Sequence, residues 1–309
     1  MTATLLSETP LPHLPSASGV EIVGPTAYVV SDDAPLLYLL DAATLASVSQ
    51  VELFASTEFG TGRIPKASKP DLESMAVVRA PTGATGLLLC GSGAQPTRET
   101  GYFVGLPAPT ASPEGAAPRF VQRLDLGPLY AQLRARLPAG TTLNLEALAA
   151  TPTELLLLQR SVGGGPAVVF GLPLAATLAH LFTPHSPVPA PARVLSFKLP
   201  QLESYAAGFS GATFVDGHLL VTASVEATAD AVADGATLGS FVGSLNLKAQ
   251  TATFAPLRWS DGRAYLGKVE GLALRRHLGP GHLELLLVTD DDQGGSTALV
   301  AEVLLAGQK

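Results

Sequence analysis

The sequence has little of several features that mark particular classes of protein. It contains a single cysteine, Cys90, among 309 residues, so a scaffold of intramolecular disulfides is excluded. Only 15% of the residues are charged, while 47% are hydrophobic, which excludes a disordered chain. No apolar run approaches the roughly 20 residues that a membrane-spanning helix needs. We therefore expect a globular protein without a membrane partner.

Strong positive charge is also missing. The 19 basic and 26 acidic residues give a formal net charge of −7, which provides no general attraction to nucleic acid or anionic lipid. The N-terminus lacks the basic stretch and the continuous apolar stretch of a secretory signal. One cysteine inside an apolar run is typical of a small buried residue in a reducing compartment. These features predict a cytoplasmic monomer that binds neither nucleic acid nor membrane.

Short apolar runs of strand length alternate with clusters of Gly, Pro, Ser and Thr along the whole chain. Examples are residues 26–30, 36–40, 86–90, 154–158, 218–222 and 284–288. This spacing predicts an all-β protein. Helical periodicity is confined to Pro128–Leu137 and Pro173–Phe182, each of which begins with proline. We expect both segments to be short helical insertions.

A weak repeat runs through the chain. Five segments begin with Ser or Glu, continue with a small residue and end in an apolar run. We call their first residues the anchor residues: Ser18, Glu73, Glu146, Ser210 and Glu270. Consecutive anchor residues lie 55, 73, 64 and 60 residues apart, which fits the length of a four-stranded antiparallel blade with long loops. The longest interval contains the first helical insertion.

The repeat also predicts that the two ends of the chain form one blade together. Neither the 39 residues after Glu270 nor the 17 residues before Ser18 can form a blade alone. An N-terminal strand over residues 3–9 would complete the last blade and close the ring. We therefore predict a single domain spanning residues 1–309, a five-bladed β-propeller. A pair of β-sandwiches is the alternative, and it leaves the recurring Ser and Glu unexplained.

In a propeller, the anchor residues would meet at the central axis, once per blade. Three carboxylates crowded there would repel one another and raise one another's pKa unless a cation neutralised them. Calcium suits such a site because it accepts six to eight oxygen ligands in flexible geometry, whereas magnesium demands a tighter octahedron. The six histidines show no metal-ligand pairing, which disfavours zinc. The alternative is a wet channel whose polar residues bind only water.

The loops that enter and leave the predicted inner strands carry further candidates. Basic side chains there could hold a small anionic molecule such as a phosphate ester: Lys69, Arg98, Arg160 and Lys268, with Arg63 and Lys66 nearby. Three aspartates could activate a water for attack on that ligand: Asp32, Asp33 and Asp291.

The anchor strings resemble a known family. Ser18-Gly19, Gly208-Phe209-Ser210-Gly211 and Lys268-Val269-Glu270-Gly271 are similar to strings of the calcium-activated nucleotidase (apyrase) family, a five-bladed propeller with a central calcium. The resemblance implies that the five anchor residues are calcium ligands. Lys69-Pro70-Asp71-Leu72-Glu73 and Asp290-Asp291-Asp292 also resemble a group of uncharacterised bacterial proteins, which implies no activity.

Two functional hypotheses follow. In the first, a central calcium and the basic loop residues named above bind a small anionic ligand, and the protein is a calcium-dependent phosphohydrolase. In the second, the propeller is a non-catalytic ligand-binding or scaffold protein whose ion only holds the blades together.

Overall fold

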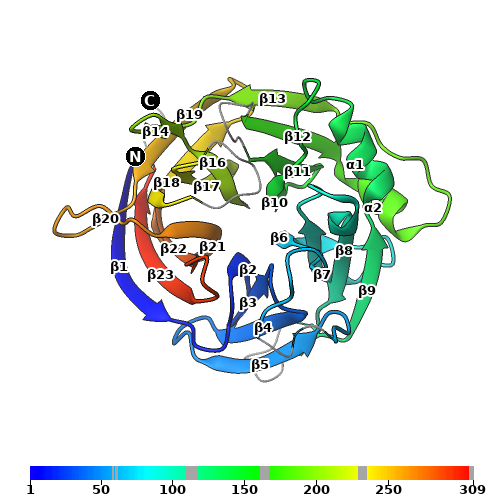
Figure 1. The fold of residues 1–309 in the computed structure, drawn as a ribbon, viewed down its shortest axis with the longest axis horizontal. Coiled ribbons are helices and arrows are strands. Elements are labelled where there is room, and N and C mark those ends of the chain that lie inside the picture. The colour runs from blue at the N-terminus through cyan, green and yellow to red at the C-terminus, as the bar shows by residue number, and fades with distance from the viewer. Residues whose placement is uncertain (58, 60–61, 109–116, 161–166, 229–234, 306–309) are drawn as a thin grey trace.

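Five small sheets form a ring around a central axis in the computed structural model (Figure 1). The structure describes residues 1–57, 59, 62–108, 117–160, 167–228 and 235–305. The five inner strands of the ring are β2 (Ala17–Val23), β6 (Leu72–Arg79), β10 (Leu145–Ala150), β16 (Gly208–Val215) and β21 (Lys268–Gly279). Each of them contacts the inner strands of both neighbouring sheets. The architecture is the predicted five-bladed β-propeller.

Blades 1 to 4 are each built from four consecutive antiparallel strands. Blade 1 contains β2 (Ala17–Val23), β3 (Thr26–Ser31), β4 (Leu36–Asp41) and β5 (Ser47–Glu52). Blade 2 contains β6 (Leu72–Arg79), β7 (Thr85–Gly91), β8 (Thr100–Gly105) and β9 (Phe120–Asp125). Blade 3 contains β10 (Leu145–Ala150), β11 (Glu154–Gln159), β12 (Ala167–Pro173) and β13 (Arg193–Phe197). Blade 4 contains β16 (Gly208–Val215), β17 (His218–Glu226), β18 (Thr237–Asn246) and β19 (Thr251–Pro256).

Blade 5 joins the two ends of the chain. It contains β21 (Lys268–Gly279), β22 (His282–Asp290), β23 (Ser296–Leu304) and the N-terminal β1 (Thr2–Pro10). β1 pairs antiparallel with β23, from Thr2 opposite Leu304 to Pro10 opposite Thr297. The short β20 (Arg258–Trp259) adds a parallel edge to β1. The predicted closure of the last blade by an N-terminal strand is confirmed.

The hydrophobic core is divided among the five interfaces between blades. Side chains alternate across each strand, so one strand supplies two interfaces. In β7, Leu87 and Leu89 pack toward blade 1, while Leu88 and Cys90 pack toward blade 3. Burial raises the pKa of the Cys90 thiol to about 12, which agrees with its predicted role as a small buried residue.

Short helices cover the interface between blades 2 and 3. They are α1 (Gly127–Arg134) and α2 (Leu174–Phe182), with a 3₁₀ turn at Pro96–Arg98. A small hairpin of two-residue strands, β14 (Gln201–Leu202) and β15 (Tyr205–Ala206), follows blade 3 in the chain. Both predicted insertions are present with shifted ends. The second begins one residue late because Pro173 still pairs with Glu154 in the sheet. Within the described residues, every helix is too short or too polar to cross a membrane.

Candidate functional site

Each anchor residue is the extra residue of a β-bulge. The pairing between the first and second strands skips Ser18, Glu73, Glu146, Ser210 and Glu270 in turn. A bulge leaves its extra residue outside the hydrogen-bond ladder and redirects its side chain. The same local distortion therefore presents one Ser or Glu from every blade near the central axis.

The small residue that follows each anchor allows the inner strands to approach closely. A Cβ on Gly211 would lie 2.9 Å from the Cα of Gly271, and one on Gly271 would lie 3.0 Å from the Cα of Gly19. The first distance is shorter than real Cβ contacts, and the second is tighter than most of them. The recurring pair of an anchor and a small residue thus reflects the packing of blades 4, 5 and 1 around the axis.

A small cavity lies where the inner strands meet, and we call it the axial cavity. Its volume is about 10 Å³, and its lining includes Ser18, Glu73, Glu146 and Glu270. Ser210 does not line it, although the next residue, Gly211, does. The structure therefore brings four of the five anchor residues to one cavity, whose volume is about that needed for a single water-sized particle.

The two serine anchors join neighbouring blades. Ser18 Oγ donates a hydrogen bond of 2.5 Å to the Leu72 carbonyl, and Ser210 Oγ donates one of 2.6 Å to the Val269 carbonyl. Each acceptor directly precedes the glutamate anchor of the next blade. Both hydroxyl protons are thus used between blades, and a role of these serines as calcium ligands stays a prediction.

Glu73 differs from the other acidic anchors. Among the described residues, its carboxylate forms no hydrogen bond and no ion pair. Burial, together with the negative charges of Glu146 and Asp71, raises its pKa well above the ordinary value for glutamate. A carboxylate in this position favours either a bound proton or a bound cation.

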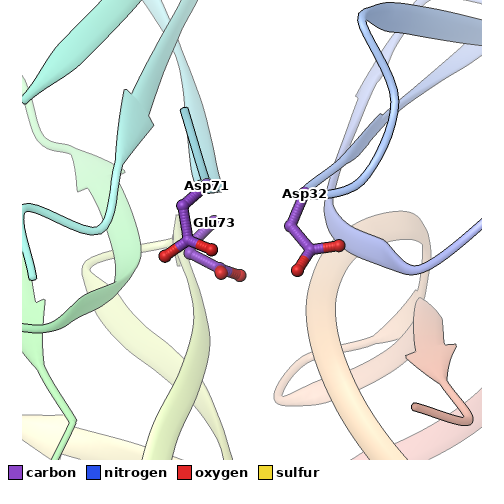
Figure 2. A group of neighbouring side chains, drawn as sticks. All are labelled: Asp32, Asp71 and Glu73. Atoms are coloured by element: carbon purple, nitrogen blue, oxygen red, sulfur yellow. The ribbon is translucent and has the colours of Figure 1, made fainter. Parts of the chain in front are cut away.

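Glu73 belongs to a group of three carboxylates that we call the acidic cluster. One oxygen each of Asp32, Asp71 and Glu73 lies within 4.8 Å of the others. Figure 2 shows the side chains of Asp71 and Glu73 opposite that of Asp32. These residues lie at the end of the ring where the inner strands begin and the second strands end, which we call the mouth. Among the described residues, Asp32 Oδ1 is buried without a hydrogen-bond partner, and burial raises the Asp32 pKa to about 7 despite the attraction of Lys69.

The basic side chains beside the acidic cluster are already paired with carboxylates. Lys69 Nζ contacts Asp32 and lies 3.1 Å from Asp33 Oδ1 and 3.3 Å from Asp71 Oδ1. Arg98 Nη1 lies 2.7 Å from Asp71 Oδ2. Both predicted ligand-binding residues thus lie at the mouth, where their charges neutralise aspartates.

Arg160 and Lys268 occupy the opposite side of the mouth. Arg160 contacts Glu226 and lies 3.4 Å from Glu146 Oε2. Lys268 Nζ lies 3.1 Å from Glu270 Oε1, 3.2 Å from Glu226 Oε1 and 2.9 Å from Asp292 Oδ1. This network links blades 3, 4 and 5. Sequence reasoning missed Glu226 as a member of the site, although it ends a second strand, as Asp290 does.

Glu270 combines an ion pair with an unsatisfied oxygen. Its side chain is only 5% exposed, and its Oε2 atom has no hydrogen-bond partner within the residues that the structure describes. Burial raises its pKa to about 8, although Lys268 and Arg160 lower it. An unsatisfied carboxylate oxygen on the lining of the axial cavity marks a position where a further polar group or ion would be stabilised.

The three predicted bases are placed differently. Asp32 and Asp33 both lie at the mouth. Burial acts to raise the pKa of Asp33, but Lys69 and hydrogen bonds from Lys69, Ser16 and Arg63 hold it below the ordinary value. Asp291 is exposed, and its Oδ1 accepts N–H groups of Gln293 and Gly295 in its own loop. The neighbouring Asp290, rather than Asp291, acts electrostatically on Asp32.

Solved structures are similar to the chain only at very low sequence identity. Glutaminyl cyclase from Myxococcus xanthus is 12% identical, with 99% of this chain and 98% of that chain covered and a TM-score of 0.48. The tail fibre of Staphylococcus aureus phage P68 is 11% identical, with 99% and 53% covered and a TM-score of 0.50. The phage likeness shows a shared fold alone. No curated protein matches the chain.

A family model spans all five blades. The model, described as a family of unknown function (DUF6929), matches residues 13–303, a range that contains every anchor residue. The acidic cluster and the axial cavity also lie inside this range. Because the match extends over nearly the whole chain, the protein belongs to the DUF6929 family.

Proposed function

We propose that the protein binds a divalent cation of the calcium type at the mouth of the ring, through Asp32, Asp71 and Glu73. The observation that carries the proposal is the Glu73 carboxylate, which has neither a hydrogen bond nor an ion pair among the described residues while two other carboxylates lie within 4.8 Å. A bound cation would neutralise Glu73 and satisfy Asp32 Oδ1, which has no hydrogen-bond partner.

The available donors favour calcium over other metals. The acidic cluster offers only carboxylate oxygens, and no histidine or cysteine of the described residues belongs to it. Calcium accepts carboxylates, carbonyls and waters in variable geometry, whereas zinc prefers nitrogen and sulfur and magnesium keeps a strict octahedron. Glu146 and Glu270, which line the axial cavity beyond Glu73, would add negative potential behind the ion.

The pairing of the basic side chains favours cation binding over direct anion binding. Lys69, Arg98, Arg160 and Lys268 each contact at least one carboxylate. An anionic ligand would therefore reach the mouth mainly through a bound cation. Hydrolysis of a phosphate ester by metal-bound water, with Asp32 as base, stays a prediction, as does the likeness to calcium-activated nucleotidases.

Calorimetric titration of calcium into chelator-treated protein tests the proposal. We expect one calcium per chain, and an affinity at least tenfold weaker in Glu73→Gln. Glu52→Gln, which changes an exposed carboxylate on β5, should bind as the wild type does. A cation present at about 100 times its Kd should also stabilise the fold by about 2.7 kcal/mol. Absence of both binding heat and thermal stabilisation after verified metal removal would overturn the proposal.

A separate screen addresses catalysis. Phosphate monoesters, phosphate diesters, nucleotides and lactones would be incubated with the protein in calcium and in chelator. Turnover that requires calcium and is lost in Glu73→Gln would support the phosphohydrolase hypothesis. Calcium binding without turnover of any of these substrates would favour the non-catalytic alternative, in which the ion only holds blades or a ligand.

A further inference from the structure

Lys69 stands out because its ammonium group contacts two of the carboxylates that a metal ion would use. Its Nζ contacts Asp32 and lies 3.3 Å from Asp71 Oδ1, so it touches two of the three members of the acidic cluster. The third partner, Asp33 Oδ1 at 3.1 Å, lies outside the cluster. Lys69, together with Arg98 beside Asp71, thus supplies positive charge that partly balances the cluster.

The position of this ammonium group is built into the fold. The Lys69 side chain is only 5% exposed, and its backbone N–H donates to the Pro65 carbonyl at 3.1 Å. Pro70 follows it, and Asp71 then adopts a left-handed conformation with φ of 56°. The segment therefore holds Lys69 and Asp71 beside each other, in contrast to a mobile lysine on the surface.

The ammonium group and a divalent ion would compete for the same two carboxylates, those of Asp32 and Asp71. Calcium lies about 2.3–2.6 Å from its carboxylate ligands. An ion on Asp32 and Asp71 would thus come within a few ångströms of Lys69 Nζ, in a site that is poorly hydrated and where like charges repel strongly. Either the lysine moves toward Asp33 when the ion binds, or the ion binds against its repulsion.

We propose that Lys69 is a tethered counter-cation, which occupies the acidic cluster in the absence of a divalent ion and competes with that ion for Asp32 and Asp71. The proposal rests on the proposed function. It explains how a ring with several buried carboxylates can fold before an ion arrives. It also makes Lys69 the residue that sets the affinity of the cluster for divalent ions.

Substitution of Lys69 by methionine tests the competition. We expect K69M to bind calcium at least tenfold more tightly than the wild type in calorimetric titration, because the competing charge is gone. Its melting temperature in chelator should fall below that of the wild type, and its rise on adding calcium should be larger. K248M, which removes an exposed lysine in the turn after β18, should match the wild type in all three measurements. Equal or weaker calcium binding by K69M would overturn the proposal.

A measurement on the wild type avoids dependence on a variant that could fail to fold. Nitrogen NMR of the lysine ammonium groups, with Lys69 assigned by K69R, should show the Lys69 signal shifting on addition of calcium while that of Lys248 stays constant. A Lys69 signal unmoved by saturating calcium would also overturn the proposal. Absence of calcium binding in both wild type and K69M would reject the proposed function itself, whereas binding that K69M leaves unchanged would reject only the tethered counter-cation.

Discussion

The carboxylates on the two sides of the mouth are neutralised in different ways. On the side of blades 3 to 5, Arg160 and Lys268 together contact or approach Glu146, Glu226, Glu270 and Asp292, so every acidic side chain has a protein cation beside it. On the side of blades 1 and 2, Lys69 and Arg98 pair with the aspartates, and Glu73 has no direct partner among the described residues. The first arrangement pairs each acidic side chain with a protein cation, whereas the second leaves one carboxylate without such a cation.

The anchor residues extend this comparison to the whole ring. All five are extra residues in β-bulges, yet they have three different uses. The serines donate to the backbone of the next blade, Glu146 and Glu270 join ion pairs, and Glu73 has no such partner in the described part of the chain. A repeated local structure therefore does not imply a repeated function, because the neighbours that decide the chemistry come from other blades.

Removal of the Arg160 guanidinium should give the largest loss of stability, because it disrupts the ion-pair network on the side of blades 3 to 5. R160M leaves Glu146, Glu226 and Glu270 short of a counter-ion, and loss of one partner from a buried network costs about 3–5 kcal/mol. Denaturant unfolding should show this loss. R263M, which breaks the exposed pair with Asp261, should cost less than about 1 kcal/mol. A similar cost for both variants would contradict the assignment of Arg160 to a buried network.

Matched glutamine variants of Glu73 and Glu270 should differ in how calcium affects their stability, because the two glutamates lie on different sides of the mouth. Because burial favours the neutral form of Glu73, E73Q in chelator should be at least as stable as the wild type, while in calcium it should be less stable by about 1–3 kcal/mol. E270Q removes a partner of Lys268 and should destabilise equally in both conditions. Melting curves in chelator and in calcium measure both. A loss of stability in E73Q that is equal in chelator and in calcium would contradict this difference between Glu73 and Glu270.

Glu21 provides a partly buried carboxylate in β2 for comparison with the acidic cluster. Burial raises its pKa to about 8, so the folded state holds a proton that the unfolded state releases between the ordinary pKa of 4.5 and about 8. Stability should fall as the pH rises through this range, by up to about 1 kcal/mol per pH unit, and then level off. E21Q should stabilise the protein at pH 9 and change it little at pH 4, as measured by denaturant unfolding. An E21Q effect that is the same at both pH values would contradict the raised pKa.

Substitution of Ser18 should have the smallest effect on stability. S18A removes the hydrogen bond to the Leu72 carbonyl, which should cost about 1 kcal/mol of unfolding free energy. Its calcium affinity should stay within about threefold of the wild type, because the cluster oxygens are untouched. A tenfold loss of affinity would instead place the Ser18 oxygen among the ligands of the ion, as the anchor ring alone predicted.

The fold could be predicted because its signal is repeated along the chain. Five anchor residues at blade-length intervals indicated the number of blades, and the short terminal segments around Ser18 and Glu270 indicated how the ring closes. Helix ends were less accurate: α1 ends at Arg134, three residues before the predicted Leu137. Element boundaries depend on local packing that a single sequence does not show.

The site could be predicted only in part. The anchors and the basic mouth residues were found, but the partners that neutralise Arg160 are Glu226, 66 residues away, and Glu270 in another blade. Which carbonyl accepts the Ser18 hydroxyl likewise depends on how the blades stack. Asp290 and Asp291 are adjacent in sequence, and a shift of one residue in a strand or loop reverses which of them faces the site.

Both proposals depend on a divalent cation bound beside Glu73, whose carboxylate has no ion pair among the described residues. An anomalous difference map from crystals grown in calcium would locate such an ion. We expect one peak among the carboxylates of Asp32, Asp71 and Glu73, absent from crystals of E73Q grown in the same solution. A map of the wild type without density at this position, or with its peak beside Glu226 and Lys268 instead, would contradict this expectation.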